Sequence, residues 1–307
     1  PKLKLATSFD AEVSFRDSSN KRVFCVHLRM EGDPSQGPDP AQDKCNMGTA
    51  PKIPDSPPPD KVIPEYTIDL DTDPRDRWAE IVKPRVAGMK NLVHTFIHGS
   101  KLINNTLTDI VVNNLAKREM KRMPQEYAEE MKGIASATGL QLGWVWIINM
   151  MYELTGFCTS AVVQDSSGIP WHARNLDFGE FFGNDKARHT WSLTGALRDL
   201  LVTVKFTRSG NEVYKSTTYA GFVGVLSASK AGAFSISVDT RYDTNLDKGI
   251  IGWLFGKYND HQFLTFETRN MMEQAPDYDS ALNGLLTYKS LGPAYIIIAG
   301  TKSGEGA

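Results

Sequence analysis

The order of the predicted elements indicates an α+β fold. Helical patterns occupy roughly residues 71–155, alternating strand patterns follow at 159–239, and a helix and an apolar strand come last, at 278–288 and 294–299. Helices that precede an antiparallel sheet, rather than alternating with its strands, are typical of layered α+β domains. This order predicts three regions: an N-terminal hairpin and proline-rich strap at 1–61, a helical region at 62–157, and a strand-rich region at 158–307.

The first region combines a hairpin with a segment that resists regular structure. Residues 11–30 alternate apolar and polar side chains around the tetrapeptide DSSN, a pattern that predicts two strands and a turn. Residues 33–61 are dense in proline and polar side chains, which exclude helix and central strand. We therefore expect a linker or surface strap there.

The helical region opens with a strand at Tyr66 to Leu70. A helix capped near Asp71 or Thr72 should follow, because Pro74 falls in the first turn, where proline is tolerated. Apolar side chains at helical spacing in 86–100 predict a face buried in the core. A surface that binds lipid is the alternative for this face.

The strand-rich region contains three predicted hairpins. They pair 159–164 with 169–176, 200–207 with 212–219, and 222–227 with 233–239, and they turn at DSSG, RSGN and SKAG. A helix at 278–288 and a strand at 294–299 complete the pattern.

Composition excludes several classes of protein. The 34 basic and 36 acidic residues give a net charge of -2, which offers no excess positive charge for nucleic acid. The longest nearly apolar run, at 143–151, is about half of the roughly 20 residues that a membrane-spanning helix needs. His94, His98 and His189 lack metal-ligand spacing. We expect neither a metal nor another cofactor.

The first hairpin of the strand-rich region directs attention to Cys158, one of three cysteines. If DSSG closes a tight turn with Asp165 opposite Gly168, Cys158 lies opposite Asn175, at the 4.5 to 5.5 Å between Cβ atoms that is typical of cross-strand pairs. The pairing also brings Arg174 close to the sulfur.

The residue types around Cys158 suit a nucleophilic thiol. A thiol attacks only as thiolate, and a nearby positive charge such as Arg174 lowers its pKa. The carboxylate of Asp177 could orient the arginine or hold an amine that serves as base. Because side chains alternate between the faces of a strand, Arg174 and Asp177 cannot both share the face of the cysteine in a regular strand. A bulge or bend near Arg174, or the reach of its long side chain, is needed. The alternative is a cysteine that is merely a small buried apolar residue.

These residues belong to a longer pattern. The segment C-T-S-x-V-x-x-D-x-x-G-x-x-x-H-x-R-N-L-D-F-G, from Cys158 to Gly179, resembles the start of the catalytic subunit in the acid ceramidase and N-acylethanolamine acid amidase family. Further matches are EYTIDLDTDPRDRW, EEMKGIASATGLQLG, YEL at 152–154, YAGFVGVLS and PAYIIIAGTKSGEG. The resemblance therefore covers roughly residues 62–306 and is closer on the ceramidase side.

The resemblance implies an N-terminal nucleophile amidase. Cys158 would cleave the chain after Phe157 and thereafter carry a free α-amine, which titrates near 7.7 to 8.0 and can take the thiol proton. Arg174 matches an active-site arginine, and Asp177 matches the aspartate that interacts with the amine. Asn175 lies between them. His172, in the same strand, is interpreted as a packed residue rather than a base.

The implied fold is an αββα sandwich in which 62–157 is like the α-subunit and 158–307 is like the β-subunit. The implied substrate is ceramide or a related N-acyl lipid, hydrolysed without a metal, with contact to a lipid membrane surface. A lysosomal or secreted protein is expected, and Asn104 begins an N-glycosylation sequon.

Two departures from the family pattern matter. The family's N-E-R or D-E-R segment appears as Asp239-Thr240-Arg241, and we expect Asp239 and Arg241, with Asn175, to contact substrate. A T-N-Y-D segment, whose asparagine serves the oxyanion hole in the family, does not occur in residues 1–307. The expectation is that a longer chain or a second chain completes the site and the layer that covers the sheet, so that residues 294–299 expose apolar surface without it. The alternative is a catalytically impaired lipid-binding or scaffold member of the same fold.

Overall fold

The computed structural model describes residues 8–16, 22–31, 62–99, 105–178, 184–185, 190–241, 249 and 252–307. The chain divides into two compact units, Pro1–Asp60 and Lys61–Ala307. In the first unit, β1 (Ser8–Arg16) pairs antiparallel with β2 (Arg22–Glu31), with Val13 opposite Val26, so the predicted hairpin is confirmed. The proposed strap at 33–61 lies outside the described residues.

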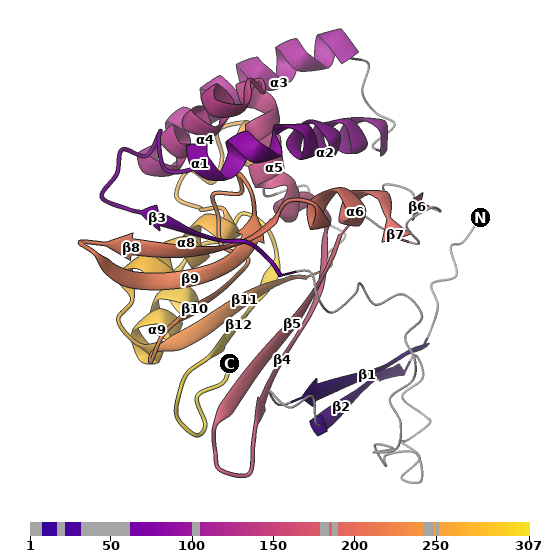
Figure 1. The fold of residues 1–307 in the computed structure, drawn as a ribbon, viewed down its shortest axis with the longest axis vertical. Helices are drawn as coiled ribbons and strands as arrows, with labels where there is room; N and C mark the ends of the chain where they lie inside the picture. The colour runs from indigo at the N-terminus through magenta and orange to yellow at the C-terminus, as the bar shows by residue number, and fades with distance from the viewer. Residues whose placement is uncertain are drawn as a thin grey trace. The chain divides into compact units, whose positions relative to one another are not determined.

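The second unit is built on a mixed six-stranded sheet in the order β12-β11-β10-β9-β8-β3 (Figure 1). Its strands are β3 (Glu65–Asp69), β8 (Leu201–Arg208), β9 (Asn211–Tyr219), β10 (Ser227–Lys230), β11 (Phe234–Thr240) and β12 (Ala294–Ala299). All neighbours are antiparallel except β3 and β8, which run parallel. The predicted hairpin at 200–219 is confirmed, whereas the parallel pairing was not predicted.

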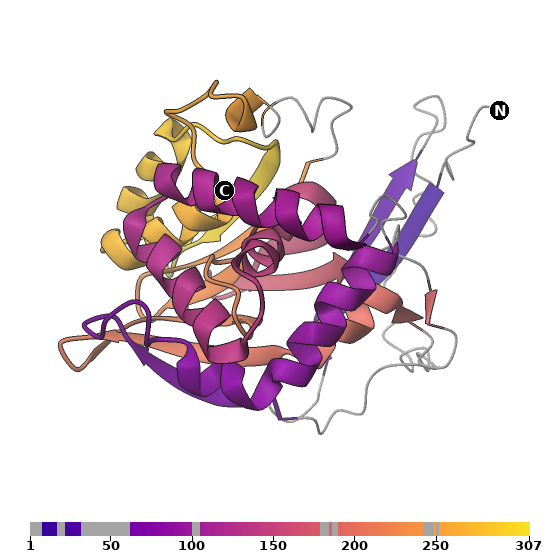
Figure 2. The same ribbon diagram turned by 90° about the horizontal axis from the view of Figure 1, so that it is seen from above.

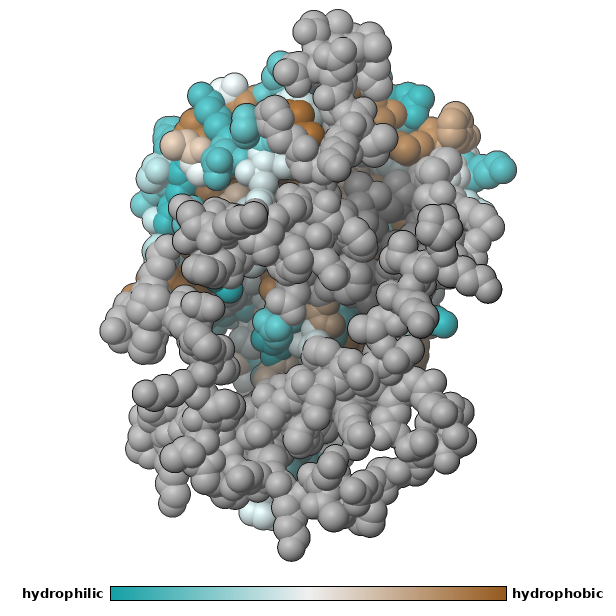
Figure 3. All heavy atoms as spheres, turned by 90° about the vertical axis from the view of Figure 1, so that its right-hand side faces the viewer, coloured by the Kyte–Doolittle hydropathy of each residue, from teal (hydrophilic) through white to brown (hydrophobic). Residues whose placement is uncertain are grey.

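Five helices of the N-terminal half gather over one end of this unit (Figure 2). They are α1 (Ala79–Val82), α2 (Val86–Gly99), α3 (Asn105–Glu119), α4 (Gln125–Thr138) and α5 (Leu142–Thr155), with single 3-10 turns at Lys83–Arg85 and Met120–Arg122. The predicted core face of α2 is confirmed, since Met89, Leu92 and Val93 are buried. Hydrophilic and hydrophobic side chains are interspersed over the helical end of the face in Figure 3.

The predicted helix start near Asp71 or Thr72 is wrong. The Asp69 carboxylate accepts a hydrogen bond from the backbone N–H of Asp71, and that of Asp73 accepts one from Arg75. Such Asx turns satisfy the backbone locally and compete with helix. Helix α1 therefore begins only at Ala79.

Different layers cover the two faces of the six-stranded sheet. On one face Arg269 of α8 (Leu264–Gln274) lies over the ring of Phe206 in β8, and α9 (Tyr278–Thr287) contacts β12. The other face of β11 presents Ser235 and Ser237 to a separate hairpin of β4 (Gly156–Gln164) and β5 (Pro170–Phe178). Helix α6 (Ser192–Arg198) and the short strands β6 (Asn184–Asp185) and β7 (Thr190–Trp191) follow this hairpin. The mixed helices and sheet confirm an α+β fold.

The predicted strand at 222–227 begins only at Ser227. Before it, the backbone N–H of Val223 donates to the Asn149 side chain at 2.6 Å, and that of Val225 donates to the carbonyl oxygen of Thr265 at 2.9 Å. A Cβ on Gly224 would lie 2.6 Å from Thr265 Oγ1, so only glycine permits this close approach. Acceptors in helices α5 and α8, rather than a neighbouring strand, therefore satisfy the backbone N–H groups of this apolar segment.

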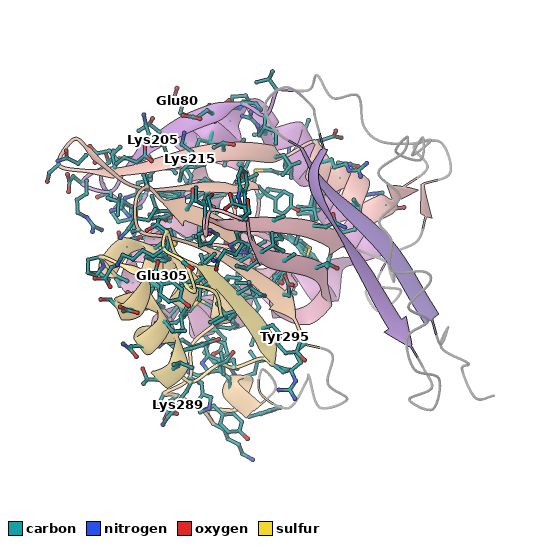
Figure 4. The ribbon with its side chains drawn as sticks, turned by 90° about the horizontal axis from the view of Figure 1, so that it is seen from below. Glu80, Lys205, Lys215, Lys289, Tyr295 and Glu305 are labelled. Carbon is teal, nitrogen blue, oxygen red and sulfur yellow. The ribbon has the colours of Figure 1, made fainter. Side chains whose placement is uncertain are left out.

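The last strand is less exposed than the sequence predicts. In β12 Tyr295 is 56% exposed and projects outward (Figure 4), whereas Ile298 is buried. Because β12 packs beside β11, residues 294–299 expose less apolar surface than predicted. No helix in the described part of the chain combines the length and apolarity needed to cross a bilayer.

Candidate active site

The register of the β4–β5 hairpin differs by one residue from the prediction. The turn holds three residues between Asp165 and Ile169, and the backbone N–H of Asp165 donates to the carbonyl oxygen of Ile169 at 3.1 Å. The Asp165 carboxylate also accepts the backbone N–H groups of Ser167 and Ile169, and Gly168 adopts a φ of 85°. A turn closed by a left-handed glycine adds one residue to a two-residue loop. Cys158 consequently pairs with Leu176 rather than with Asn175.

This register places Arg174 on the face of Cys158 without a bulge, whereas Asp177 takes a position of the opposite face. Ser160 pairs with Arg174, and Cys158 pairs with Leu176 two positions along each strand, so the four residues share one face. Asn175 pairs with Thr159 and belongs to the opposite face. The backbone of Asp177 pairs with that of Phe157, the residue before the cysteine, but the side chains of both lie outside the described residues.

Two side chains contact the sulfur of Cys158. Arg174 Nη2 donates to Sγ at 3.1 Å, and the hydroxyl of Tyr152, near the end of α5, lies 3.3 Å from Sγ. Burial raises the pKa of the thiol, and the charge of Arg174 and the Tyr152 hydroxyl oppose that effect only in part. The thiol is therefore held in its protonated form.

Arg174 is fixed by groups far along the chain. Its Nη1 donates to Ser227 Oγ at 2.7 Å, and its Nη2 also donates to the Val238 carbonyl oxygen at 2.6 Å. Its Nε lies 3.7 Å from the Asp239 carboxylate, and 8% of the side chain is exposed. Strands β10 and β11 thus hold the guanidinium against the sulfur, which gives the thiol a permanent neighbouring positive charge.

The predicted substrate contacts are only partly brought together. Asp239 lies at the site, where burial raises the pKa of its carboxyl although it accepts a hydrogen bond from Ser160 at 2.8 Å and faces Arg174. Arg241 instead places its guanidinium over the Tyr295 ring, 5.8 Å from the ring centre. Asn104 lies outside the described residues.

Two adjoining clefts run along β5. One has a volume of about 440 Å³ and includes apolar side chains, and the other, of about 390 Å³, is rich in hydroxyls. Arg174, Thr217 and Ser227 border both. The apolar members are Leu176, Leu197 and Leu201; the hydroxyl members include Ser229, Ser235 and Ser237. A substrate with an apolar and a polar part would thus meet different surfaces on either side of Arg174.

Some site residues were not predicted from the sequence. Tyr152 lies six residues before the cysteine and begins the YEL match. The match singles out this tyrosine but gives it no role. Ser160 and Ser227 also lie in matched segments, C-T-S and YAGFVGVLS, that give them no role, whereas Val238 lies in none of them. The contacts of all three depend on long-range pairing. Among the described residues, no group of three histidine, cysteine or acidic side chains is placed to hold a metal ion.

A hydrogen-bonded chain extends from the site to His172. Ser160 Oγ lies 2.8 Å from Ser237 Oγ, which lies 2.8 Å from His172 Nε2. The other ring nitrogen lies 2.9 Å from Ser235 Oγ. The imidazole is thus clamped between two hydroxyls of β11, as expected for a packed residue.

The pH dependence of stability should report on this clamp. Burial, and then the charge of Arg174, lower the pKa of His172 to about 4, below the ordinary value of about 6.5. The neutral ring therefore contributes stability that is present above pH ~6.5 and is lost as the pH falls towards 4. Between these limits the free energy of unfolding, measured in urea, should fall by about 2 kcal/mol more for the natural protein than for His172→Gln, after allowance for solvent screening. Parallel pH curves for the two proteins would contradict this assignment.

Comparison with known proteins places the chain among lipid amidases. A family described as the beta subunit of N-acylethanolamine-hydrolyzing acid amidase matches residues 61–121. Acid ceramidase from Pan troglodytes is 37% identical over 275 residues, which cover 87% of this chain and 67% of that protein. The Homo sapiens and Mus musculus acid ceramidases are 36% and 35% identical over the same length.

A solved structure also resembles part of the chain. It is the Caenorhabditis elegans ortholog of N-acylethanolamine-hydrolyzing acid amidase, 28% identical, with a TM-score of 0.39 over 48% of this chain and 57% of that one.

Proposed function

Because the chain belongs to the acid ceramidase and N-acylethanolamine acid amidase family, we propose that it is a cysteine amidohydrolase acting on N-acyl lipids. The substrate would be ceramide or a related N-acyl amide, cleaved into fatty acid and amine. The observation that carries the proposal is the hydrogen bond of 3.1 Å from Arg174 Nη2 to Cys158 Sγ. A guanidinium held on a thiol stabilises the thiolate that attacks a carbonyl carbon.

The first step in this proposal is cleavage of the chain by its own cysteine. The Cys158 sulfur attacks the carbonyl carbon of Phe157 and the peptide C–N bond breaks. The nitrogen takes up the proton that the thiol loses and becomes the α-amine of Cys158. Water then hydrolyses the resulting thioester, which leaves a carboxylate on Phe157 and restores the thiol. The α-amine can thereafter take the thiol proton, since amines of this kind titrate near 7.7 to 8.0.

The uncleaved chain is expected to be latent for hydrolysis. Its thiol has a raised pKa because of burial, and the nitrogen of Cys158 is still part of an amide and cannot act as a base. Cleavage creates the base within the nucleophilic residue itself. Asp177 would hold this amine, in keeping with its backbone position opposite Phe157.

Turnover then repeats the same chemistry on a lipid amide. The thiolate attacks the acyl carbon, the amine leaves with the proton that the α-amine carried, and water releases the fatty acid from the thioester. The cleft that contains Leu176, Leu197 and Leu201 is the proposed site for the acyl chain, since it adjoins Arg174. Neither a metal nor another cofactor takes part in any of these steps.

The wider setting is proposed on the same basis. The fold would be an αββα sandwich, of which α8 and α9, the six-stranded sheet and the β4–β5 hairpin supply three layers. Asn175 and Asp239 would contact substrate beside Arg174, with Arg241 further out, just after the end of β11. A further segment or second chain would supply the oxyanion donor, and contact with a lipid membrane surface would deliver the substrate. A lysosomal or secreted location with a glycan on Asn104 is also proposed; removal of the glycan by a glycosidase should increase gel mobility.

Acidified, purified protein should separate into residues 1–157 and 158–307, as measured by intact mass spectrometry. The rate should be first order and independent of protein concentration, because the nucleophile is in the same chain. The cleaved protein should hydrolyse a fluorogenic N-acyl amide, with full activity in chelator and none after treatment with iodoacetamide. A cleavage rate that rises with protein concentration would point to a different protease or to cleavage between molecules.

The scaffold alternative rests on Thr240, which stands where the family pattern has glutamate. It requires that the chain bind N-acyl lipid without cleaving itself or its ligand. Saturable binding of a fluorescent N-acyl lipid by a chain that remains intact at acidic pH would favour this alternative over the amidohydrolase.

A further inference from the structure

Tyr152 belongs to the segment before the proposed cleavage point, yet it reaches the sulfur. It is 1% exposed, and its hydroxyl lies 3.3 Å from Cys158 Sγ. We propose that Tyr152 is a catalytic residue whose hydroxyl accepts a hydrogen bond from the thiol and, once the thiol has lost its proton, donates a hydrogen bond to the thiolate. The proposal rests on the proposed function, because it assigns Tyr152 a role in the reaction of Cys158.

The contacts determine the direction of each hydrogen bond in the resting site. Tyr152 has a single hydroxyl proton, which it donates to the carbonyl oxygen of Val238. Its oxygen can therefore only accept from the thiol, so the S–H of Cys158 is directed at Tyr152. Arg174 Nη2 approaches the same sulfur as a donor. In the resting site the sulfur thus accepts a hydrogen bond from Arg174 and donates one to Tyr152.

Loss of the thiol proton changes this arrangement at little cost. The hydroxyl of Tyr152 can rotate towards the thiolate, and the Val238 carbonyl retains its hydrogen bond of 2.6 Å from Arg174 Nη2. No acceptor is left without a partner by the rotation, which matters because an unsatisfied buried acceptor costs free energy. The thiolate gains a second donor that the thiol did not have.

The proton balance is simple. The thiol proton passes to the α-amine of Cys158 in the cleaved protein, Tyr152 keeps its own proton throughout, and no electron is transferred. When the acyl–sulfur bond forms, the negative charge leaves the sulfur and the hydroxyl returns to Val238. Tyr152 therefore stabilises the thiolate only in the interval in which it is charged.

The two residues would lie on separate chains after cleavage. Tyr152 stays in place because its ring is buried and its hydroxyl bonds to β11, so the segment before Phe157 would supply part of the site to the segment after it.

The test compares Tyr152→Phe with the matched variant Tyr214→Phe in the full chain. Tyr214 is also fully buried, but its hydroxyl has no hydrogen-bond partner in the described part of the protein. The rate of iodoacetamide alkylation at Cys158, located by peptide mass spectrometry, is measured against pH. Tyr152→Phe should raise the thiol pKa and reduce alkylation at neutral pH by about 10- to 100-fold, since the thiolate loses one hydrogen bond. Tyr214→Phe should match the natural protein.

A second replacement protects the test against misfolding. 3-Fluorotyrosine at position 152 keeps the ring and the hydroxyl but donates a stronger hydrogen bond, so it should lower the thiol pKa. Equal thiol pKa values in the natural, phenylalanine and fluorotyrosine proteins would overturn the proposal. The rate of alkylation at Cys158 can be measured whether or not the chain cleaves itself or hydrolyses a lipid. If Tyr152→Phe shifts the thiol pKa in a chain that never cleaves itself, the role of Tyr152 at the sulfur is supported and the proposed function is rejected.

Discussion

Cys158→Ala should leave a single chain of 307 residues at every pH and abolish hydrolysis of N-acyl amides. Both reactions require the same sulfur as nucleophile, so one substitution removes both. Deleting the nucleophile of a covalent hydrolase lowers the rate on the order of a million-fold, which exceeds the detection range of most assays. Intact mass spectrometry measures the first reaction, and release of a fluorescent amine measures the second.

The other two cysteines provide the matched controls. Cys25→Ala and Cys45→Ala each remove one cysteine from the first unit of the chain and should leave the cleavage rate unchanged. Cys158→Ser distinguishes chemistry from packing, because it keeps a side chain of similar shape with a poorer nucleophile. Undiminished cleavage in Cys158→Ala would show that the Phe157–Cys158 bond is broken by another agent.

The sequence predicts the site better than it predicts its exact register. Alternation and turn residues identify β4 and β5, and together they bring Arg174 near Cys158. One left-handed residue, Gly168, decides whether the loop holds two residues or three, and that choice moves each partner by one position. The change places Arg174 on the face of the cysteine, which the predicted register could do only with a bulge.

Long-range partners are harder to predict for a physical reason. Ser227 and Val238 hold Arg174 from strands more than fifty residues away, and no local period signals such a pairing. The same applies to β3, which pairs parallel with β8 across more than a hundred residues. Helix α8 was not predicted, although its Arg269 is one of the largest fully buried side chains. A buried arginine is interpretable only once its acidic partner is known.

That partner is Glu130, and Glu130→Gln is expected to lower the free energy of unfolding by about 3 to 5 kcal/mol. The carboxylate has no exposed surface and accepts two hydrogen bonds from Arg269, both at 2.7 Å. It also accepts from Trp78 Nε1 at 2.6 Å and from Arg77 Nη1 at 2.8 Å. Glutamine would leave the buried guanidinium groups without this negative charge and would direct an N–H₂ group at them.

The position of this cluster explains the size of the effect. Arg77 and Trp78 precede α1, Glu130 belongs to α4, and Arg269 comes from α8, so a single carboxylate joins the helical region to the layer that covers the sheet. Glu273 is the remaining acidic partner of Arg269, at 2.9 Å, and it also pairs with Arg208. Arg77 would keep the partly exposed Glu126 and Arg269 would keep Glu273, but both arginines would lose the buried carboxylate that now joins them.

The neighbouring Glu129→Gln is the control. Glu129 forms its ion pairs with Arg75 and Lys132 near the surface, so this substitution should lower the free energy of unfolding by at most about 1 kcal/mol.

The pH dependence of the free energy of unfolding gives an independent check. Burial alone would raise the pKa of Glu130, but Arg269, Trp78 and Arg77 outweigh it and lower the pKa. The stabilisation is therefore present above the unfolded pKa of about 4.3 and is lost as the pH falls through the lower folded value. Urea unfolding should show a large difference between the natural protein and Glu130→Gln at pH 7 that narrows in strong acid. A loss at pH 7 no larger than that of Glu129→Gln would mean that the buried carboxylate does not stabilise the junction between the helices and the sheet.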